Sequence, residues 1–160
     1  VNVLQPGAKI KPENIVYVGL KDLDQGEIDL IRKEKLTAFT IMDIVKNGFA
    51  PVIASITDLQ GKVGNIWVSL DIDSIDKEYA PASLMATSGS LTQREIVHLT
   101  KFIGKMCKVI GFDIVELAPK LDVDGKTVHL VIELIANLLG SEYSWYTQYM
   151  KKEIDKQNSN

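Results

Sequence analysis

Four short hydrophobic runs, rich in valine and isoleucine, are spread along the chain and separated by longer amphipathic stretches. Each run is nearly continuous instead of alternating with polar residues, a pattern that predicts β-strands buried on both faces. The predicted strands cover residues 14–20, 38–41, 65–70 and 108–115.

Hydrophobic residues at helical spacing predict α-helices between and after these runs. Pro51 suits the first turn of one helix, Thr92 suits the N-cap of another, and Gly140 suits the end of a third. Strands that alternate with helices predict the α/β class, with a parallel sheet covered on both faces. The predicted helices cover residues 27–34, a stretch from Pro51 to Leu59, residues 91–106 and residues 126–139.

Length and composition are those of one globular domain. A chain of 160 residues can bury roughly two thirds of its unfolded surface. Its 46% hydrophobic and 24% charged residues exclude a disordered or fibrous protein. We therefore expect a single α/β domain over residues 1–150 and a polar tail over residues 151–160.

Charge and hydropathy argue against two classes of partner. The net charge is −3 and the lysines are scattered, so we expect no nucleic-acid partner. The longest apolar runs fall far short of the roughly 20 residues that span a bilayer, so we expect no membrane partner. The single cysteine, Cys107, cannot form an internal disulfide, which fits a cytoplasmic protein. We expect it to be a small buried residue, the alternative being a nucleophile.

Acidic residues follow two of the predicted strands. Asp71 and Asp73 lie where the third strand ends, and on an extended backbone both carboxylates would project from the same side of the sheet. A hard cation would relieve their repulsion, whereas the alternative is that they cap a helix or face solvent. Asp113 and Glu116 lie at the end of the fourth strand in the same way. Since ligands bind at the carboxyl ends of parallel strands, both clusters point to one edge of the sheet.

Three segments carry a resemblance to a known family. They are "SLDIDSIDKEYAP" (69–81), "SGSLTQREI" (88–96) and "GFDIVELAP" (111–119). In this order and spacing they resemble the C-terminal half of the ureohydrolases, the arginase and agmatinase family. The resemblance runs from about Asn14 to Gly140, and it implies a three-layer α/β/α fold with a mostly parallel sheet, lacking the N-terminal half.

The same resemblance implies an activity. Ureohydrolases cleave a guanidinium carbon–nitrogen bond with a bridging hydroxide held between two manganese ions about 3.5 Å apart. Here it implies that Asp71 and Asp73 are metal ligands, with Asp71 bridging and catalytic. Glu116 would be the catalytic residue that pairs with the substrate guanidinium.

Further roles follow from the resemblance outside the metal site. "GLKDLDQGE" (19–27) resembles the arginase branch, which implies that L-arginine is converted to ornithine and urea, with agmatine or another guanidino compound left open. Asp24 would face the substrate α-amino group, with Glu27 behind it. Arg94 and Glu95 match a pair near the subunit contact of trimeric arginases, which implies a homo-oligomer.

The sequence also departs from the family pattern. The histidines and aspartates that the first half of the family chain contributes to the metals have no counterpart here, and we expect His98 and His129 to be structural. Lys77 replaces a proline, Lys21 replaces an arginine, and residues 83–88 replace a pocket loop. The isolated chain is therefore expected to be inactive.

Three hypotheses remain open. The first is a ureohydrolase completed by another chain or segment. The second is a non-catalytic interaction or oligomerisation module descended from an arginase, and the third is a weak metal-binding domain. Because half of a wound sheet would expose a strand edge and apolar faces, we expect a homo-oligomer or a complementary chain to cover them.

Overall fold

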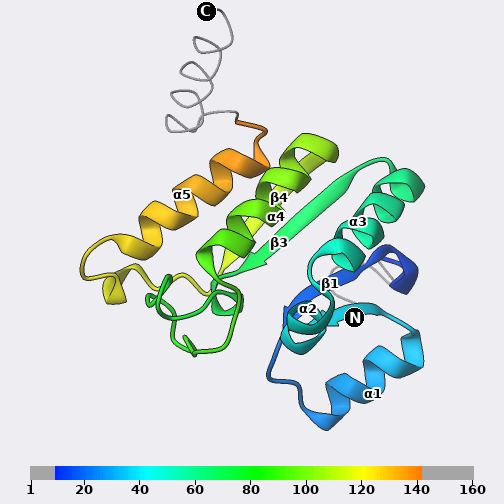
Figure 1. The fold of residues 1–160 in the computed structure, drawn as a ribbon, viewed down its shortest axis with the longest axis horizontal. Helices are drawn as coiled ribbons and strands as arrows, with labels where there is room; N and C mark the ends of the chain where they lie inside the picture. The colour runs from blue at the N-terminus through cyan, green and yellow to red at the C-terminus, as the bar shows by residue number, and fades with distance from the viewer. Residues whose placement is uncertain (1–9, 142–160) are drawn as a thin grey trace, which may run out of the picture.

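The computed structural model describes residues 10–141, in which parallel strands alternate with helices (Figure 1). This arrangement confirms the predicted α/β class. The polar tail at 151–160 lies outside the described residues. The strands are β1 (Val16–Leu20), β2 (Thr37–Thr40), β3 (Ile66–Asp71) and β4 (Val109–Val115). The helices are α1 (Gln25–Glu34), α2 (Ile41–Asn47), α3 (Ala50–Val63), α4 (Gln93–Met106) and α5 (Lys126–Leu138). Short 3-10 turns span Pro12–Asn14, Ile72–Ser74 and Pro119–Leu121.

The four strands form two parallel pairs, not the single continuous sheet expected from the sequence. β1 pairs with β2, and β3 pairs with β4 in a register that aligns Trp67 with Gly111 and Asp71 with Val115. On its other sides β1 contacts helices α2 and α3. Within residues 10–141, no strand therefore joins the two pairs, and each pair keeps free backbone edges.

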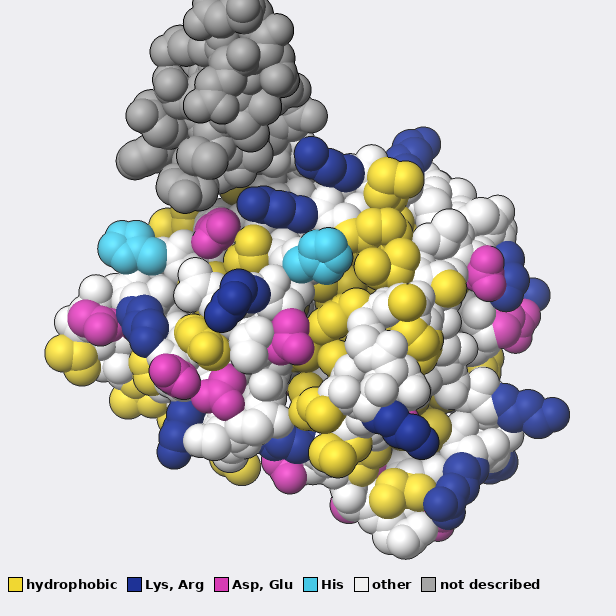
Figure 2. Space-filling model, in the orientation of Figure 1, with side chains coloured by type: hydrophobic (Ala, Val, Ile, Leu, Met, Phe, Trp, Pro, Cys, Tyr) yellow, Lys and Arg dark blue, Asp and Glu magenta, His cyan; other side chains and the backbone are white. Residues whose placement is uncertain are grey.

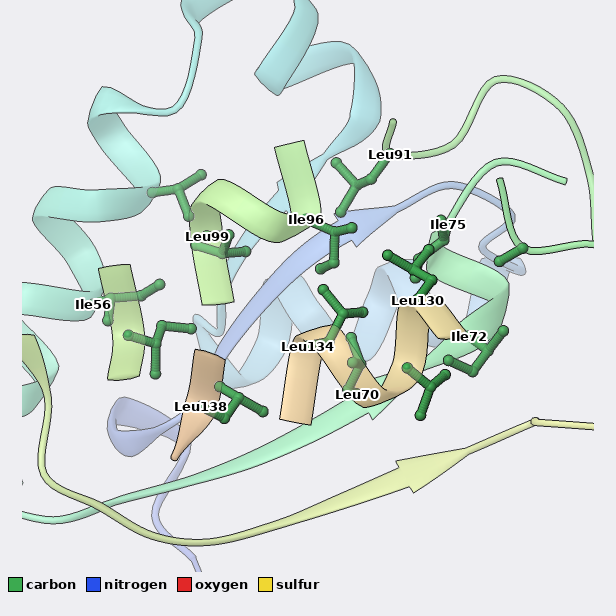
Figure 3. Packing of buried hydrophobic residues seen from close by; sticks show 14 of the residues in the cluster. Ile56, Leu70, Ile72, Ile75, Leu91, Ile96, Leu99, Leu130, Leu134 and Leu138 are labelled. Carbon is green, nitrogen blue, oxygen red and sulfur yellow. The ribbon is translucent and has the colours of Figure 1, made fainter. Parts of the chain in front are cut away.

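The main core lies between the β3–β4 pair and the helices α4 and α5, which run side by side across one face of it (Figure 1). Leu70 of β3 and Leu134 of α5 are buried there, and Figure 3 shows Leu134 lying close to Ile96 of α4. Burying apolar side chains on one strand face and two helix stripes stabilises this half of the molecule.

The opposite face of β3–β4 is uncovered within the described residues. Trp67 is 61% exposed and Val115 is 39% exposed, although both lie on strands. The ring of Trp67 lies over Gly111, where an added Cβ would come within 2.3 Å of the indole. The expectation of a sheet covered on both faces therefore holds for only one face of this pair.

Local signals explain where the helices begin. α1, α2 and α4 each start with a capping box, in which the N-cap side chain and the acidic residue three positions later satisfy each other's backbone amides. Thr92 is the N-cap of α4, as expected, and Pro51 lies in the first turn of α3. The short helix α2 was not predicted, although Thr40 and Asp43 carry its capping box.

The carboxyl end of β1 packs against the segment that leads into α4. Gly19 has a left-handed φ of +81°, and a Cβ there would lie 3.1 Å from Leu91 Cδ1. The contact brings the loop after β1 next to the loop after β3. No helix in residues 10–141 has both the length and the apolar character needed to cross a membrane.

Candidate active site at the ends of β3 and β4

Asp71 is the last residue of β3, and its side chain is exposed. Its carboxylate Oδ1 accepts a hydrogen bond from the backbone N of Asp73 at 2.8 Å, so Asp71 caps the 3-10 turn that follows. The backbone does not stay extended through Asp73, and that part of the sequence argument was wrong. One oxygen of Asp71 is engaged locally, while its position at the strand end is as predicted.

Asp73 is partly buried in the 3-10 turn that follows β3. Its pKa is raised, chiefly by burial and then by the negative charges of Asp71 and Glu116, while Lys21 acts in the opposite direction. The buried hydroxyl of Ser83 donates a hydrogen bond to its Oδ1. The negative charges of Asp71 and Glu116 therefore both act on Asp73, and we call these three residues the acidic cluster.

Glu116 follows β4 directly and takes a left-handed φ of +61°. Because Asp71 is aligned with Val115, the register places Glu116 one position beyond the end of β3. A non-glycine residue in this conformation carries a backbone cost that often marks a functional position. The side chain is exposed at the same strand ends as Asp71.

Asp113 lies within β4 and not at its end, which corrects its predicted place. The Ser69 hydroxyl donates to its Oδ1 and the Trp67 indole donates to its Oδ2, both at 2.6 Å. These two bonds, from Ser69 first and Trp67 second, lower the pKa of Asp113. Its carboxylate accepts hydrogen bonds from side chains on the open sheet face and is not part of the acidic cluster.

The other predicted site residues have structural partners. Asp24 and Glu27 form the capping box of α1, with bonds of 2.8 Å in each direction, and both are exposed. Glu95 accepts from the backbone and hydroxyl of Thr92 at the start of α4, while Arg94 beside it is exposed. One carboxylate oxygen of Asp24 makes no contact in the capping box, so the box leaves room for a further partner.

Sequence reasoning noted Lys21 and the loop at residues 83–88 as departures from the family pattern, but it missed the contacts by which Lys21 and Ser83 organise this region. Ser83 is buried and bonds Asp73, and Lys21 reaches from the end of β1 to the loop after β3. The loop borders an open hollow of about 740 Å³. The residues that line the hollow are Asp76, Lys77, Glu78, Pro81, Ser83, Ala86 and Ser88. No local pattern distinguishes Ser83, because its role depends on where the loop folds back.

The described residues do not complete a metal site. Carboxylate oxygens suit manganese, and the acidic cluster supplies them. However, across residues 10–141 no group of three or more histidine, cysteine, aspartate or glutamate side chains converges as a metal site would require. His98 on α4 and His129 on α5 are both exposed. This part of the chain alone therefore does not fit a two-metal centre.

Comparison with protein families gives a match to the model described as "Arginase family" over residues 3–140. That range covers most of the chain. The chain belongs to the arginase family. The resemblance carried by the three sequence segments is thereby confirmed.

Individual relatives agree with this family membership. The arginase of Plasmodium berghei is 35% identical over an alignment covering 83% of this chain and 42% of the relative. The arginase of Staphylococcus aureus strain MRSA252 is 32% identical, covering 82% of this chain and 44% of the relative. This arginase-family chain thus spans less than half the length of these curated relatives.

Solved structures give the same fold. The arginase of Bacillus subtilis superposes with a TM-score of 0.83 at 29% identity, covering 89% of this chain and 51% of that one. An Entamoeba histolytica arginase in complex with L-ornithine superposes with a TM-score of 0.76 at 30% identity, covering 82% and 44%. The arginase fold is therefore present over about half of the length of these proteins.

Proposed function

We propose that this chain contributes one side of a manganese-dependent ureohydrolase site that hydrolyses a guanidinium carbon–nitrogen bond, with L-arginine as substrate and ornithine and urea as products. The observation that carries the proposal is the placement of Asp71, Asp73 and Glu116 at the neighbouring ends of the paired strands β3 and β4. Three carboxylates from two neighbouring strand ends suit a site for cations, either metal or guanidinium.

Each residue has a role that its chemistry supports. Asp71 and Asp73 would each offer an oxygen to manganese, whose bound form would supply a nucleophilic hydroxide in the completed site. Glu116 would receive the planar guanidinium through charge-assisted hydrogen bonds. The carboxylate of Asp24 would accept a hydrogen bond from the substrate α-amino group, with Glu27 holding Asp24 in place through the capping box.

The remaining ligands would come from a complementary chain or segment, because the described residues do not supply them. The arginases similar to this chain are about twice as long as the part that matches it. The substrate class is supported by those relatives' names and by the L-ornithine bound to the Entamoeba enzyme. A cytoplasmic location, inferred from the single cysteine, stays a prediction.

The test combines metal binding with turnover. Manganese is titrated calorimetrically into the full chain, alone and with a separate polypeptide corresponding to the other half of an arginase, and urea release from arginine and agmatine is then measured. We expect weak or no binding alone, and manganese binding with urea release in the mixture. Asp71→Ala should abolish the metal signal, whereas Asp58→Ala, an exposed change on α3, should not.

The outcomes separate the proposal from its rival. Unchanged manganese affinity in Asp71→Ala would show that its ligand role is wrong. No metal binding and no turnover in any mixture would favour a non-catalytic interaction or oligomerisation module. That second function has its own support in the open β3–β4 face with Trp67, and in the α2 side chains Met42 and Val45, each 72% exposed. Figure 2 shows a band of hydrophobic side chains between the α4–α5 region and the α1–α3 region.

A further inference from the structure

We propose that Lys21 is a positioning residue that ties the end of β1 to the loop at residues 83–90 and so sets the span of the substrate pocket. The part of the inference that concerns substrate rests on the proposed function. The connection between the two loops rests on the hydrogen bonds of Lys21 alone. The inference assigns a specificity role to a residue outside the acidic cluster.

The Lys21 ammonium group is surrounded by oxygen atoms of that loop. Nζ donates to the hydroxyls of Thr87 and Ser90, the latter at 2.9 Å, and lies 3.4 Å from the carbonyl of Ser88. A lysine ammonium has three donors, which these three acceptors match. The Lys21 side chain is only 25% exposed, and a further contact, to Asp22, measures 3.8 Å.

The two halves of the loop are held by different parts of the molecule. The start of the loop is held by Ser83, which donates to Asp73, and by the preceding Ala82, whose N donates to the Thr127 hydroxyl of α5 and whose O accepts from Ala118 N. The second half bonds its own stem, through Lys77 N to Thr87 O at 3.1 Å and Gly89 N to the Asp76 carboxylate at 2.7 Å. Lys21 adds to this half a tie to the β1–β2 pair, which shares no strand ladder with β3–β4.

The tie connects the two ends of the proposed substrate site. Lys21 lies three residues before Asp24, the proposed partner of the α-amino group, while Ser83 and Ser88 of the loop line the hollow beside Asp73. Lys21 joins the loop after β1, which carries Asp24, to the loop at residues 83–90, which lies beside Asp73. It would thereby fix the distance between the group that binds the substrate α-amino end and the groups near its guanidinium end. Loss of Lys21 should therefore weaken arginine binding without removing any reacting group.

The first experiment needs no turnover. Amide hydrogen exchange is measured in the full chain and in Lys21→Met, which keeps the side-chain length and removes the donors. We expect the Gly89 and Lys77 amides to exchange about tenfold faster, since a bond from a charged donor is among the stronger hydrogen bonds. The α4 amide of Ile103 should be unchanged. The matched control is Lys33→Met, on an exposed α1 lysine whose side chain is 79% accessible.

Reciprocal variants test the contacts themselves. The double variant Thr87→Val with Ser90→Ala leaves Lys21 in place and should accelerate the same two amides. If Lys21→Met fails to fold, this double variant alone tests the same contacts. Adding Lys21→Met to this variant should produce little further change, because both remove the same tie. Unchanged exchange in these variants, strictly additive effects, or an equal effect from Lys33→Met would overturn the proposal.

The second readout concerns substrate. In the completed enzyme we expect Lys21→Met to raise the KM for arginine about tenfold, with kcat within about twofold. This is the result expected when an interaction that binds substrate and transition state equally is lost. Manganese affinity should be unchanged. A fall in kcat with unchanged KM would overturn the specificity role. If the unmodified assembly shows no turnover, the proposed function fails, while the exchange experiment still decides whether Lys21 ties the loops.

Discussion

The indole Nε1 of Trp67 donates a hydrogen bond to Asp113 Oδ2 at 2.6 Å, joining neighbouring strands on the open face of β3–β4. Trp67 remains 61% exposed despite this bond. A large aromatic side chain on an uncovered sheet face is typical of surfaces that contact another chain or segment. The bond fixes one end of the indole, whose ring lies over Gly111.

Association should therefore bury Trp67. In a Trp145→Phe background, which leaves Trp67 as the one tryptophan of the 160-residue sequence, the emission maximum should shift to shorter wavelength as protein concentration rises or as the complementary half is added. Light scattering should give a mass above the 17.8 kDa of one chain. A monomer of that mass with constant emission would argue against any partner on this face.

Asp113 should make the fold sensitive to acid. Its pKa lies below 3.8 because the Ser69 hydroxyl, and then the Trp67 indole, donate to the ionised form. The folded state thus binds this proton less readily than the unfolded state, so the contribution is complete above pH 3.8 and is lost as pH falls through the folded-state pKa. Asp113→Asn should be less stable than the natural chain at neutral pH, and the two should converge in strong acid. Urea unfolding across this pH range measures the difference.

Gly104 should be required for the contact between α4 and α5. An added Cβ would lie 1.9 Å from the backbone oxygen of Asn137, and a backbone atom cannot rotate aside. Gly104→Ala should therefore lower the free energy of unfolding by about 3 kcal/mol or more. Gly61→Ala on α3, where no atom lies within 4 Å, should instead raise it by roughly 0.5–1 kcal/mol. Equal effects of the two changes in urea unfolding would contradict this view of the helix packing.

Cys107 should be a slow nucleophile. It is half-buried against the core at the C-cap of α4, and burial raises the pKa of its thiol. Since the thiolate is the reactive form, alkylation at neutral pH should be slower than for an exposed cysteine peptide, and the rate should rise only at higher pH. A rate equal to or above that of the peptide would revive the catalytic alternative.

Local sequence signals predicted much of the fold. The four hydrophobic runs, the N-cap Thr92 and the first-turn Pro51 lie in or beside the elements expected, because strand burial and helix initiation depend on residues close in sequence. The helix α2 was missed because only seven residues form it, and its signal is confined to the Thr40–Asp43 capping box.

The candidate site was only partly predictable. Asp71, Asp73 and Glu116 could be assigned to strand ends from the apolar runs that precede them, and the parallel pairing of β3 with β4 places those ends side by side. Asp113 was misplaced because a carboxylate within a strand is indistinguishable in sequence from one at its end. Asp24 and Glu27, assigned to substrate, also cap α1, which a motif alone does not reveal.

The sequence by itself determined the alternation of strands and helices, the acidic residues at the strand ends and the family. Within residues 10–141, tertiary structure decided that the strands form two separate pairs and that one face of β3–β4 stays open. It also decided that Lys21 meets the loop at residues 83–90 and that Ser83 meets Asp73 of the acidic cluster. The physical reason is distance along the chain. Propensity and capping act over a few residues, whereas Lys21 and Ser90 are 69 positions apart and meet only once the chain has folded.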